Sequence, residues 1–311
     1  MGHRQQVEGV LRALATPARL IELDYRWPLG PSDLVPLATI RHLTPATRAL
    51  LLPPWPDVVV AAGRRTAPVA RWLERASGGR VFTVQLMRPG CLAGLDLVAI
   101  PAHDRPRPAA NVVTTLGAPH PFDRAVLDAA LAELPEAAAR LPDPRIAVLV
   151  GGPSGSVPFD RADEARFVAE LGEFARSLDA SLLVTTSRRT PDSLLRALGA
   201  VAGGRMVLHR FGAPGPNPFR AFLAAADRVV VTADSASMLS EASATGRPIH
   251  VFRPQGLPDK HGRLVDALAA AGYVRPWSAE PQPVPPPLDE AGRLAAIVRT
   301  RAALAGQRPR V

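Results

Sequence analysis

The chain has 311 residues, of which 47% are hydrophobic and 21% charged, and its formal net charge is +9. This composition excludes a wholly disordered chain, and the length is typical of two domains of roughly 150 residues each. No apolar run approaches the ~20 residues that a membrane-spanning helix needs. The sole cysteine, Cys91, excludes an intrachain disulfide. We therefore expect a cytoplasmic protein, with a peripheral contact to the inner membrane left open.

The positive charge comes almost entirely from arginine, because Lys260 is the only lysine among the 37 basic residues. A GC-rich coding sequence is one explanation. The other is an anionic partner, such as nucleotide phosphates, anionic lipid headgroups or nucleic acid. Nucleic acid is the weakest of these, because the chain has no basic run interleaved with aromatic residues and no zinc-finger spacing.

Short β-branched runs alternate with amphipathic segments along the whole chain. In the first half, the runs predict strands at 19–23, 57–62, 81–86, 95–100 and 111–114, with helices at 5–15, 66–76 and 121–140. In the second half, they predict strands at 145–150, 181–186, 206–209, 228–232 and 248–252, with helices at 161–178, 190–198, 218–226 and 237–245. This alternation indicates an α/β protein with parallel sheets, built as two Rossmann-like domains that face a cleft.

The domain boundary is expected at Leu141-Pro142-Asp143-Pro144, because two prolines around one residue cannot continue a helix. The first domain is therefore predicted at 1–143 and the second at 144–275. A proline-rich stretch then leads into a last amphipathic helix, so that 276–311 forms a linker and a terminal helix.

A Gly/Ser loop at 151–156 directly follows the strand at 145–150. Its residues Gly152, Ser154 and Gly155 allow a ligand to approach the backbone closely, although a tight turn explains them as well. The loop lacks the spacing of a dinucleotide fingerprint, a P-loop or a nucleophile elbow.

Three further polar motifs follow later strands or open helices. Residues 185–191 place hydroxyls and two arginines before a helix, where guanidinium groups suit a phosphate but can also face solvent. Asn217 precedes another helix, for which a capping role is sufficient. The segment 234–242 combines hydroxyls at a helix start with a carboxylate one turn later, so it can hold a phosphate and a ribose, or only cap the helix. The candidate ligand-binding residues of these motifs are Ser187, Arg188, Arg189, Thr190, Asn217, Asp234, Ser235, Ser237, Met238 and Glu241.

No D-x-D motif and no metal-ligand spacing of histidines occurs, so we expect no metal and no cofactor. Taken together, the motifs resemble the mitochondrial fission ELM (elongated mitochondria) family, which includes many bacterial proteins. The segments that carry the resemblance are Gly63-Arg64-Arg65-Thr66, Pro101-Ala102-His103-Asp104, the loop from Gly151, the segment from Thr185, Asn217-Pro218 and the segment from Asp234.

The resemblance implies a GT-B glycosyltransferase-like fold, in which the first domain serves the acceptor, the second binds a nucleotide-sugar and the last helix crosses back to the first. It also implies that the family's usual first strand is missing ahead of Met1-Gly2-His3. The plant member acts in mitochondrial fission, a role that we do not transfer to this chain.

Two functions remain open from the sequence. One is a metal-independent glycosyltransferase that uses a nucleotide-sugar donor and a lipid-linked or envelope acceptor. His103 or Asp104 would then be the general base, and Arg64 would lie beside the leaving diphosphate. The other is a non-catalytic binding or scaffold protein of the same fold at a membrane surface. The sequence leaves the oligomeric state open.

Overall fold

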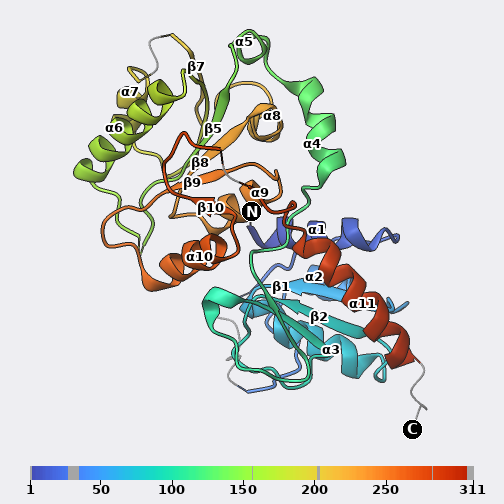
Figure 1. The fold of residues 1–311 in the computed structure, drawn as a ribbon. Helices are drawn as coiled ribbons and strands as arrows, with labels where there is room; N and C mark the ends of the chain where they lie inside the picture. Colours follow the sequence, from blue (N-terminus) through green and yellow to red (C-terminus); the bar gives the residue numbers. More distant parts are fainter. Residues whose placement is uncertain (1, 27–34, 156, 202–203, 282, 307–311) are drawn as a thin grey trace. The chain divides into compact units, whose positions relative to one another are not determined.

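The computed structural model describes residues 2–26, 35–155, 157–201, 204–281 and 283–306. The chain forms two compact units, one made of Met1–Pro121 with Asp289–Val311 and the other of Phe122–Leu288. Each unit is an α/β structure around one parallel sheet (Figure 1), so the predicted fold class is confirmed in its two parallel-sheet units. None of the described helices has both the length and the apolar character needed to cross a membrane.

The first unit contains a four-stranded parallel sheet in the order β1-β2-β3-β4. Its elements are α1 (Gly2–Leu14), α2 (Pro45–Ala49), β1 (Val58–Ala62), η1 (Arg64–Thr66), α3 (Ala67–Ala76), β2 (Phe82–Leu86), β3 (Leu97–Pro101), η2 (Ala102–Asp104), β4 (Val112–Thr115) and α11 (Glu290–Gly306). The strands β2 and β3 are buried along their whole length, as expected of strands with helices on both faces.

The terminal helix α11 belongs to this first unit. The Arg299 guanidinium donates to the carbonyls of Ala13 and Leu14 at the end of α1, at 2.6 and 3.1 Å. The Glu290 carboxylate accepts from the Leu116 amide at 2.6 Å. Leu294, Ala295 and Val298 complete the apolar core beneath β2.

The strand predicted at 19–23 is wrong. These residues join no sheet, and the one ladder contact nearby is an antiparallel bridge between Tyr25 and Leu43. Ile21 and Leu23 instead pack with Leu43 and with Val69 of α3. Their apolar residues alternate because the segment packs one face against a helix. An edge strand has the same alternation, so the two cannot be distinguished from the sequence.

The second unit contains a six-stranded parallel sheet in the order β10-β9-β8-β5-β6-β7. Its elements are α4 (Arg124–Ala130), η3 (Leu131–Glu133), α5 (Glu136–Ala139), β5 (Arg145–Val150), α6 (Arg161–Ser177), β6 (Ser181–Thr186), α7 (Asp192–Leu198), β7 (Met206–His209), α8 (Phe219–Ala225), β8 (Arg228–Thr232), α9 (Ala236–Ser243), β9 (Ile249–Phe252), α10 (Asp259–Ala270) and β10 (Val274–Arg275). Helix α10, strand β10 and, in the first unit, helix α2 were not predicted from the sequence.

The single helix predicted at 121–140 is divided into α4, η3 and α5, because Pro135 cannot continue a helix. The division between the units falls after Pro121, ahead of the proline pair where we expected it. The cause lies in the packing of this segment: the Phe122 ring lies 6.0 Å from that of Phe219 on α8, and Leu134 and Leu141 join a core cluster with Phe222.

Candidate site at the carboxyl edge of the second sheet

The strand order of the second sheet reverses at β5. Strand β5 pairs with β6 on one side and with β8 on the other. After β5 the chain adds β6 and β7 on one side of the sheet, and from β8 onward it adds strands on the other side. In open α/β sheets, ligands bind at the carboxyl ends of the strands at such a switch point. The loop after β5 and the segment after β8 are two of the motifs singled out from the sequence.

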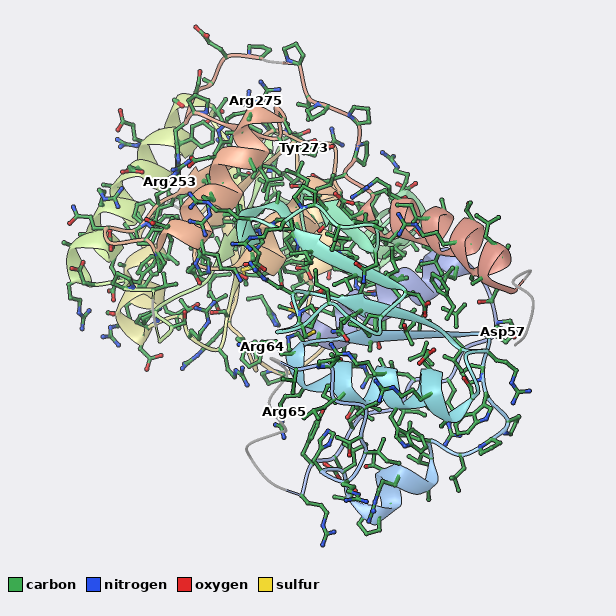
Figure 2. All side chains as sticks on the ribbon, turned by 90° about the horizontal axis from the view of Figure 1, so that it is seen from below. Asp57, Arg64, Arg65, Arg253, Tyr273 and Arg275 are labelled. Atoms are coloured by element: carbon green, nitrogen blue, oxygen red, sulfur yellow. The ribbon has the colours of Figure 1, made fainter. Side chains whose placement is uncertain are left out.

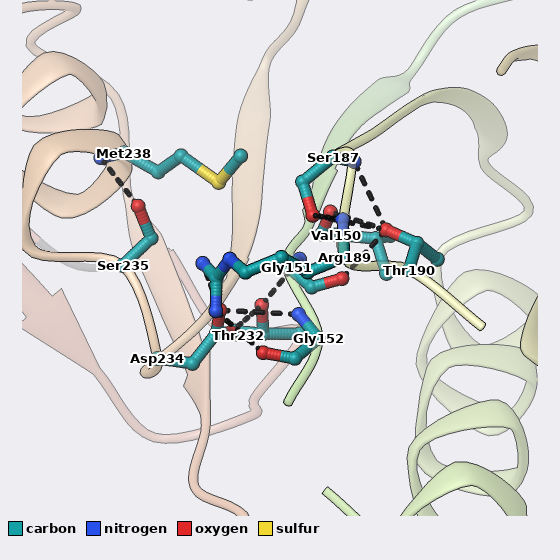
Figure 3. A network of polar contacts seen from close by, with 10 residues as sticks. All are labelled: Val150, Gly151, Gly152, Ser187, Arg189, Thr190, Thr232, Asp234, Ser235 and Met238. Atoms are coloured by element: carbon teal, nitrogen blue, oxygen red, sulfur yellow. Dashed lines mark hydrogen bonds and ion pairs between the residues drawn. The ribbon is translucent and has the colours of Figure 1, made fainter. Parts of the chain in front are cut away.

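The Asp234 carboxylate joins these two segments (Figure 3). One oxygen accepts from the Thr232 hydroxyl at 2.6 Å and the other from the Gly152 amide at 3.1 Å. The same Thr232 hydroxyl accepts from the Gly151 amide at 2.8 Å. Because the side chain of Asp234 is fully buried, these bonds replace the water that a carboxylate would otherwise require.

Arg189 supplies the opposite charge. Its guanidinium donates to the Asp234 carboxylate at 2.7 Å and to the Gly152 carbonyl at 2.6 Å, with 31% of its side chain exposed. A Cβ on Gly151 would overlap the Asp234 carboxylate, and one on Gly152 would overlap the Arg189 carbonyl. The two glycines are therefore required by the approach of the surrounding protein groups, which the sequence could not reveal.

Residues of the motif after β6 form hydrogen bonds with the glycine loop that follows β5. The Thr190 hydroxyl donates to the carbonyl of Gly151 at 2.6 Å and accepts from the Ser187 amide at 2.9 Å. The Ser187 hydroxyl accepts from the Arg189 amide at 3.1 Å. Arg188 is exposed. The two consecutive arginines thus have different environments, because Arg189 pairs with a buried carboxylate and Arg188 is exposed.

The start of α9 provides the hydroxyls of the site. Ser235 is the N-cap, and its side chain accepts from the Met238 amide at 3.4 Å. Ser237 follows in the first turn and is half-buried. The Ser240 hydroxyl donates back to the Ala236 carbonyl at 2.8 Å. The capping interpretation of this segment placed the cap at Ser237, but the N-cap is Ser235.

Glu241 lies in α9 with only 5% of its surface exposed. Burial raises the pKa of its carboxyl to about 8, and the charge of Arg220 opposes this rise. Among the residues that the structure describes, no side chain forms a hydrogen bond or an ion pair with this carboxylate. A buried acid without a fixed partner costs stability and is therefore a candidate ligand group.

The remaining candidates of this unit lie around the same edge or cap a helix. Ser154 exchanges backbone hydrogen bonds with Val157, and Gly155 is exposed with open space beside it. A hollow of about 450 Å³ is lined by Pro153, Ser154, Gly155, Val157 and Pro158. Ser156, also part of the predicted loop, lies outside the described residues. The Asn217 side chain accepts from the Phe219 amide at 3.1 Å, which is the capping role.

The three catalytic candidates lie in the first unit, after strand ends. Arg64 begins η1 directly after β1, beside Arg65 (Figure 2). The turn before it is held by the buried Gln85, whose amide donates to the Gly63 carbonyl at 2.8 Å. His103 and Asp104 form η2 after β3, with His103 buried. These placements agree with the predicted strand ends.

Residues 1–302 match the family described as Mitochondrial fission ELM1. The chain belongs to this family.

Two relatives of this ELM1-family chain come from a plant and a bacterium. It is 29% identical over 284 residues to the mitochondrial fission protein ELM1 of Arabidopsis thaliana, covering 81% of this chain but 65% of the plant protein's length. It is 23% identical over 282 residues to the uncharacterized protein RP120 of Rickettsia prowazekii (strain Madrid E), covering 78% of this chain and 79% of that protein.

Two solved structures are among those similar to this ELM1-family chain. MurG of Acinetobacter baumannii has a TM-score of 0.46 at 15% identity, covering 99% of this chain and 92% of MurG. The UDP-GlcNAc 2-epimerase of Methanocaldococcus jannaschii, in complex with UDP-GlcNAc and UDP, has a TM-score of 0.43 at 15% identity, covering 82% of this chain and 78% of the epimerase.

Two residues of the site in this ELM1-family chain were missed from the sequence. Thr232 ends β8, and its hydroxyl accepts from the Gly151 amide and donates to the Asp234 carboxylate. The sequence feature that could have indicated this role is a threonine two residues before an aspartate at a strand end. His261, on the unpredicted α10, is electrostatically coupled to Asp234 and Arg189. No group of three or more His, Cys, Asp or Glu residues that could hold a metal occurs in the described part of the chain.

Proposed function

We propose that the second unit binds a nucleotide-sugar and that the protein is a glycosyltransferase that acts without a metal. The single observation that carries this proposal is the construction of the carboxyl edge at β5 and β8. A loop of two sterically required glycines, the hydroxyl-bearing start of α9 and a buried carboxylate without a hydrogen-bonded side chain meet at the topological switch point.

Each part of this edge suits one part of such a ligand. The exposed Gly155 lies beside the open hollow, where backbone and Ser154 can contact a phosphate. Ser237 in the first turn of α9 has a hydroxyl for the same purpose. Glu241 follows one turn later, at the spacing that places it on the same helix face as Ser237. Its carboxyl group can bind both hydroxyls of a ribose.

The contacts of Arg189 and Asp234 modify the roles expected from the sequence. Both side chains are bound to each other and to the glycine loop, so we assign them to holding the loop in shape. They are positioning residues for the ligand site. Arg188 is exposed, so its guanidinium is accessible to an anion.

We further propose that the first unit supplies the acceptor side of the reaction. His103 or Asp104 would remove the proton from the acceptor hydroxyl, and Arg64 would neutralise the leaving diphosphate. The acceptor is proposed to be lipid-linked or part of the cell envelope, in keeping with the positive net charge of +9. The fission role in the name of the plant relative is not part of this proposal.

Nucleotide binding is the direct test. UDP, GDP, ADP, CDP and dTDP are added to the full chain, and the melting temperature is measured. A ligand at 100 times its dissociation constant adds about 2.7 kcal/mol of stability, so one of the five should raise the melting temperature and the others should not. No shift with any of them contradicts nucleotide-sugar binding.

Catalysis requires a second measurement with the matching sugar nucleotide. Release of the nucleoside diphosphate in the presence of envelope lipids, lost in His103→Ala or Asp104→Ala, supports transfer. Binding without release, in wild type as in both variants, supports the non-catalytic scaffold instead.

A further inference from the structure

We propose that the first unit docks on an anionic lipid bilayer through one exposed apolar segment, residues 50–56, which we call the docking loop. The docking loop joins α2 to β1 and belongs to none of the motifs recognised in the sequence. The inference goes beyond the proposed function and uses none of the residues assigned there.

The docking loop is apolar throughout and mostly exposed. Its sequence is Leu-Leu-Leu-Pro-Pro-Trp-Pro, without a charged residue. Only Leu51 is buried and Trp55 half-buried, while Leu50 is 42% exposed and Leu52 60% exposed. Singly exposed leucines are common, but an unbroken apolar segment of this length in water marks a surface that another phase or partner covers.

Both ends of the docking loop are fixed to the fold. Leu51 is buried in a core cluster with Val69 and Leu73 of α3. At the other end, the carbonyl of Asp57 accepts from the Phe82 amide of β2 at 2.8 Å. With Leu51 occupying the core position, the leucines on either side of it remain in solvent. Their exposure therefore follows from the packing of the unit.

Two tryptophans border the docking loop. The Trp55 ring lies 6.0 Å from the ring of Trp72 on α3, at an interplanar angle of 75°, and both residues are half-buried. Indole rings favour the interface between membrane and water, because the ring is apolar while its N–H is polar. Exposed leucines beside such rings are typical of a surface that inserts among lipid headgroups.

The net charge of the chain is confined to the unit that carries this loop. Residues 1–121 with 289–311 contain 19 basic and 10 acidic residues, whereas 122–288 contain 18 of each. The units differ in acidic residues and hardly at all in basic ones, so an arginine-rich coding bias does not explain the difference. An anionic surface therefore attracts the first unit and not the second.

Cations also outnumber acids beside the docking loop. Arg48 lies in α2 just before it, and Arg75 lies in the last turn of α3, one turn after Trp72. Arg80 directly precedes the segment that pairs with Asp57. The acids of this region are Asp57 and Glu74. The local charge thus has the same sign as that of the whole unit, and it complements anionic headgroups.

The docking loop lies away from the candidate catalytic residues. Asp57 directly precedes β1 and Arg64 directly follows it, so the two lie at opposite ends of that strand (Figure 2). The candidate nucleotide site belongs to the second unit. Changes in the docking loop should therefore alter membrane binding without altering nucleotide binding.

Co-sedimentation of the full chain with vesicles tests the inference. One set of vesicles contains phosphatidylcholine alone and the other also contains phosphatidylglycerol. Wild type should bind the second set more tightly, and salt should weaken this binding. Leu50→Ser and Leu52→Ser should each bind about 10-fold more weakly, because a leucine leaves water on docking. Thermal unfolding shows whether both variants remain folded.

Leu131→Ser is the matched control. Leu131 lies in η3 of the neutral second unit and is 44% exposed, close to the 42% of Leu50. This variant should bind vesicles as wild type does. An equal loss in Leu131→Ser, or unchanged binding in Leu52→Ser, would overturn the proposal, and so would a wild type that binds neither set of vesicles.

A second pair of variants tests the charge. Arg75 and Arg196 are both exposed arginines in the last turn of a helix, one in each unit. Arg75→Gln should weaken binding to phosphatidylglycerol vesicles about 5-fold, and Arg196→Gln should not. Equal losses would show that α3 has no special position at the bilayer, which contradicts docking by this loop.

Two further outcomes separate this inference from its rivals. If the chain binds duplex DNA and no vesicles, the anionic partner is nucleic acid and the inference is overturned. Vesicle binding that depends on Leu52, without any nucleotide binding, would leave docking in place and remove the proposed function. Nucleotide binding without vesicle binding would have the opposite consequence.

Discussion

The Arg189 guanidinium lies 2.7 Å from the Asp234 carboxylate, and this pair connects the segment after β6 to the segment after β8. Between them lies the loop after β5, to which both side chains are hydrogen-bonded through Gly152. Three strand ends are thus held by one ion pair whose acidic member is fully buried. Its energetic role can be measured apart from any ligand.

Removing the acidic partner should destabilise the protein strongly. Asp234→Ala leaves the Gly152 amide without its acceptor and the Arg189 guanidinium with the Gly152 carbonyl but no opposite charge, and loss of one partner of a buried pair costs about 3–5 kcal/mol. Urea unfolding of the full chain measures this cost. The exposed pair Arg210–Asp192 is the control, and Asp192→Ala should cost less than about 1 kcal/mol. Similar losses at both aspartates would contradict the structural role of Asp234.

The glycine loop should tolerate a methyl group at one end only. Gly151→Ala and Gly152→Ala would force an overlap with Asp234 or with the Arg189 carbonyl, and overpacking of this kind costs about 1–3 kcal/mol. Gly155→Ala meets no atom within 4 Å and should change stability by less than about 0.5 kcal/mol. Thermal unfolding of the three variants tests this order, which a uniformly flexible loop would not produce.

Glu241 should determine nucleotide affinity. If its carboxyl group holds the ribose, Glu241→Ala removes about 1.5–3 kcal/mol of binding, which is roughly a 10- to 150-fold loss in affinity. Glu241→Gln should lose less, because an amide still accepts a hydrogen bond. Calorimetric titration with the nucleotide that binds wild type gives both values. Unchanged affinity in Glu241→Ala would remove this residue from the site.

The same residue should make the ligand-free protein less stable as the pH rises. The pKa of Glu241 is about 8 in the folded protein against an ordinary value of 4.5, so between these values the folded state binds more protons than the unfolded state. The contribution of this carboxyl group to the free energy of unfolding is therefore largest below pH 4.5. It decreases as the pH rises to 8, by up to about 4 kcal/mol.

Glu241→Gln removes this titration. The free energy of unfolding of the variant relative to wild type should increase from pH 5 to pH 8, and urea unfolding at several pH values measures the difference. A constant difference across this range would show that the carboxyl group titrates normally in the folded protein.

Sequence patterns alone determined the second sheet almost completely. The strands β5 to β8 begin and end where they were predicted, because each is a short apolar run between helical segments, and β5, β6 and β8 are almost wholly buried. The positions of the glycine loop, Asp234 and Ser235 at strand ends followed from the same pattern. Local chemistry was sufficient, since every one of these signals lies within one strand–loop–helix segment.

Only the tertiary structure decided which of these polar groups serve each other. Asp234 and Arg189 are 45 residues apart, and Gly152 and Asp234 are 82 apart, so no local spacing could show that they bind one another. Helix α10 was not predicted, and with it the position of His261, because that position depends on the packing of α10 against α9. Likewise, residues 19–23 have a strand-like pattern, but they pack on α3, where apolar contacts across distant segments outweigh the local propensity.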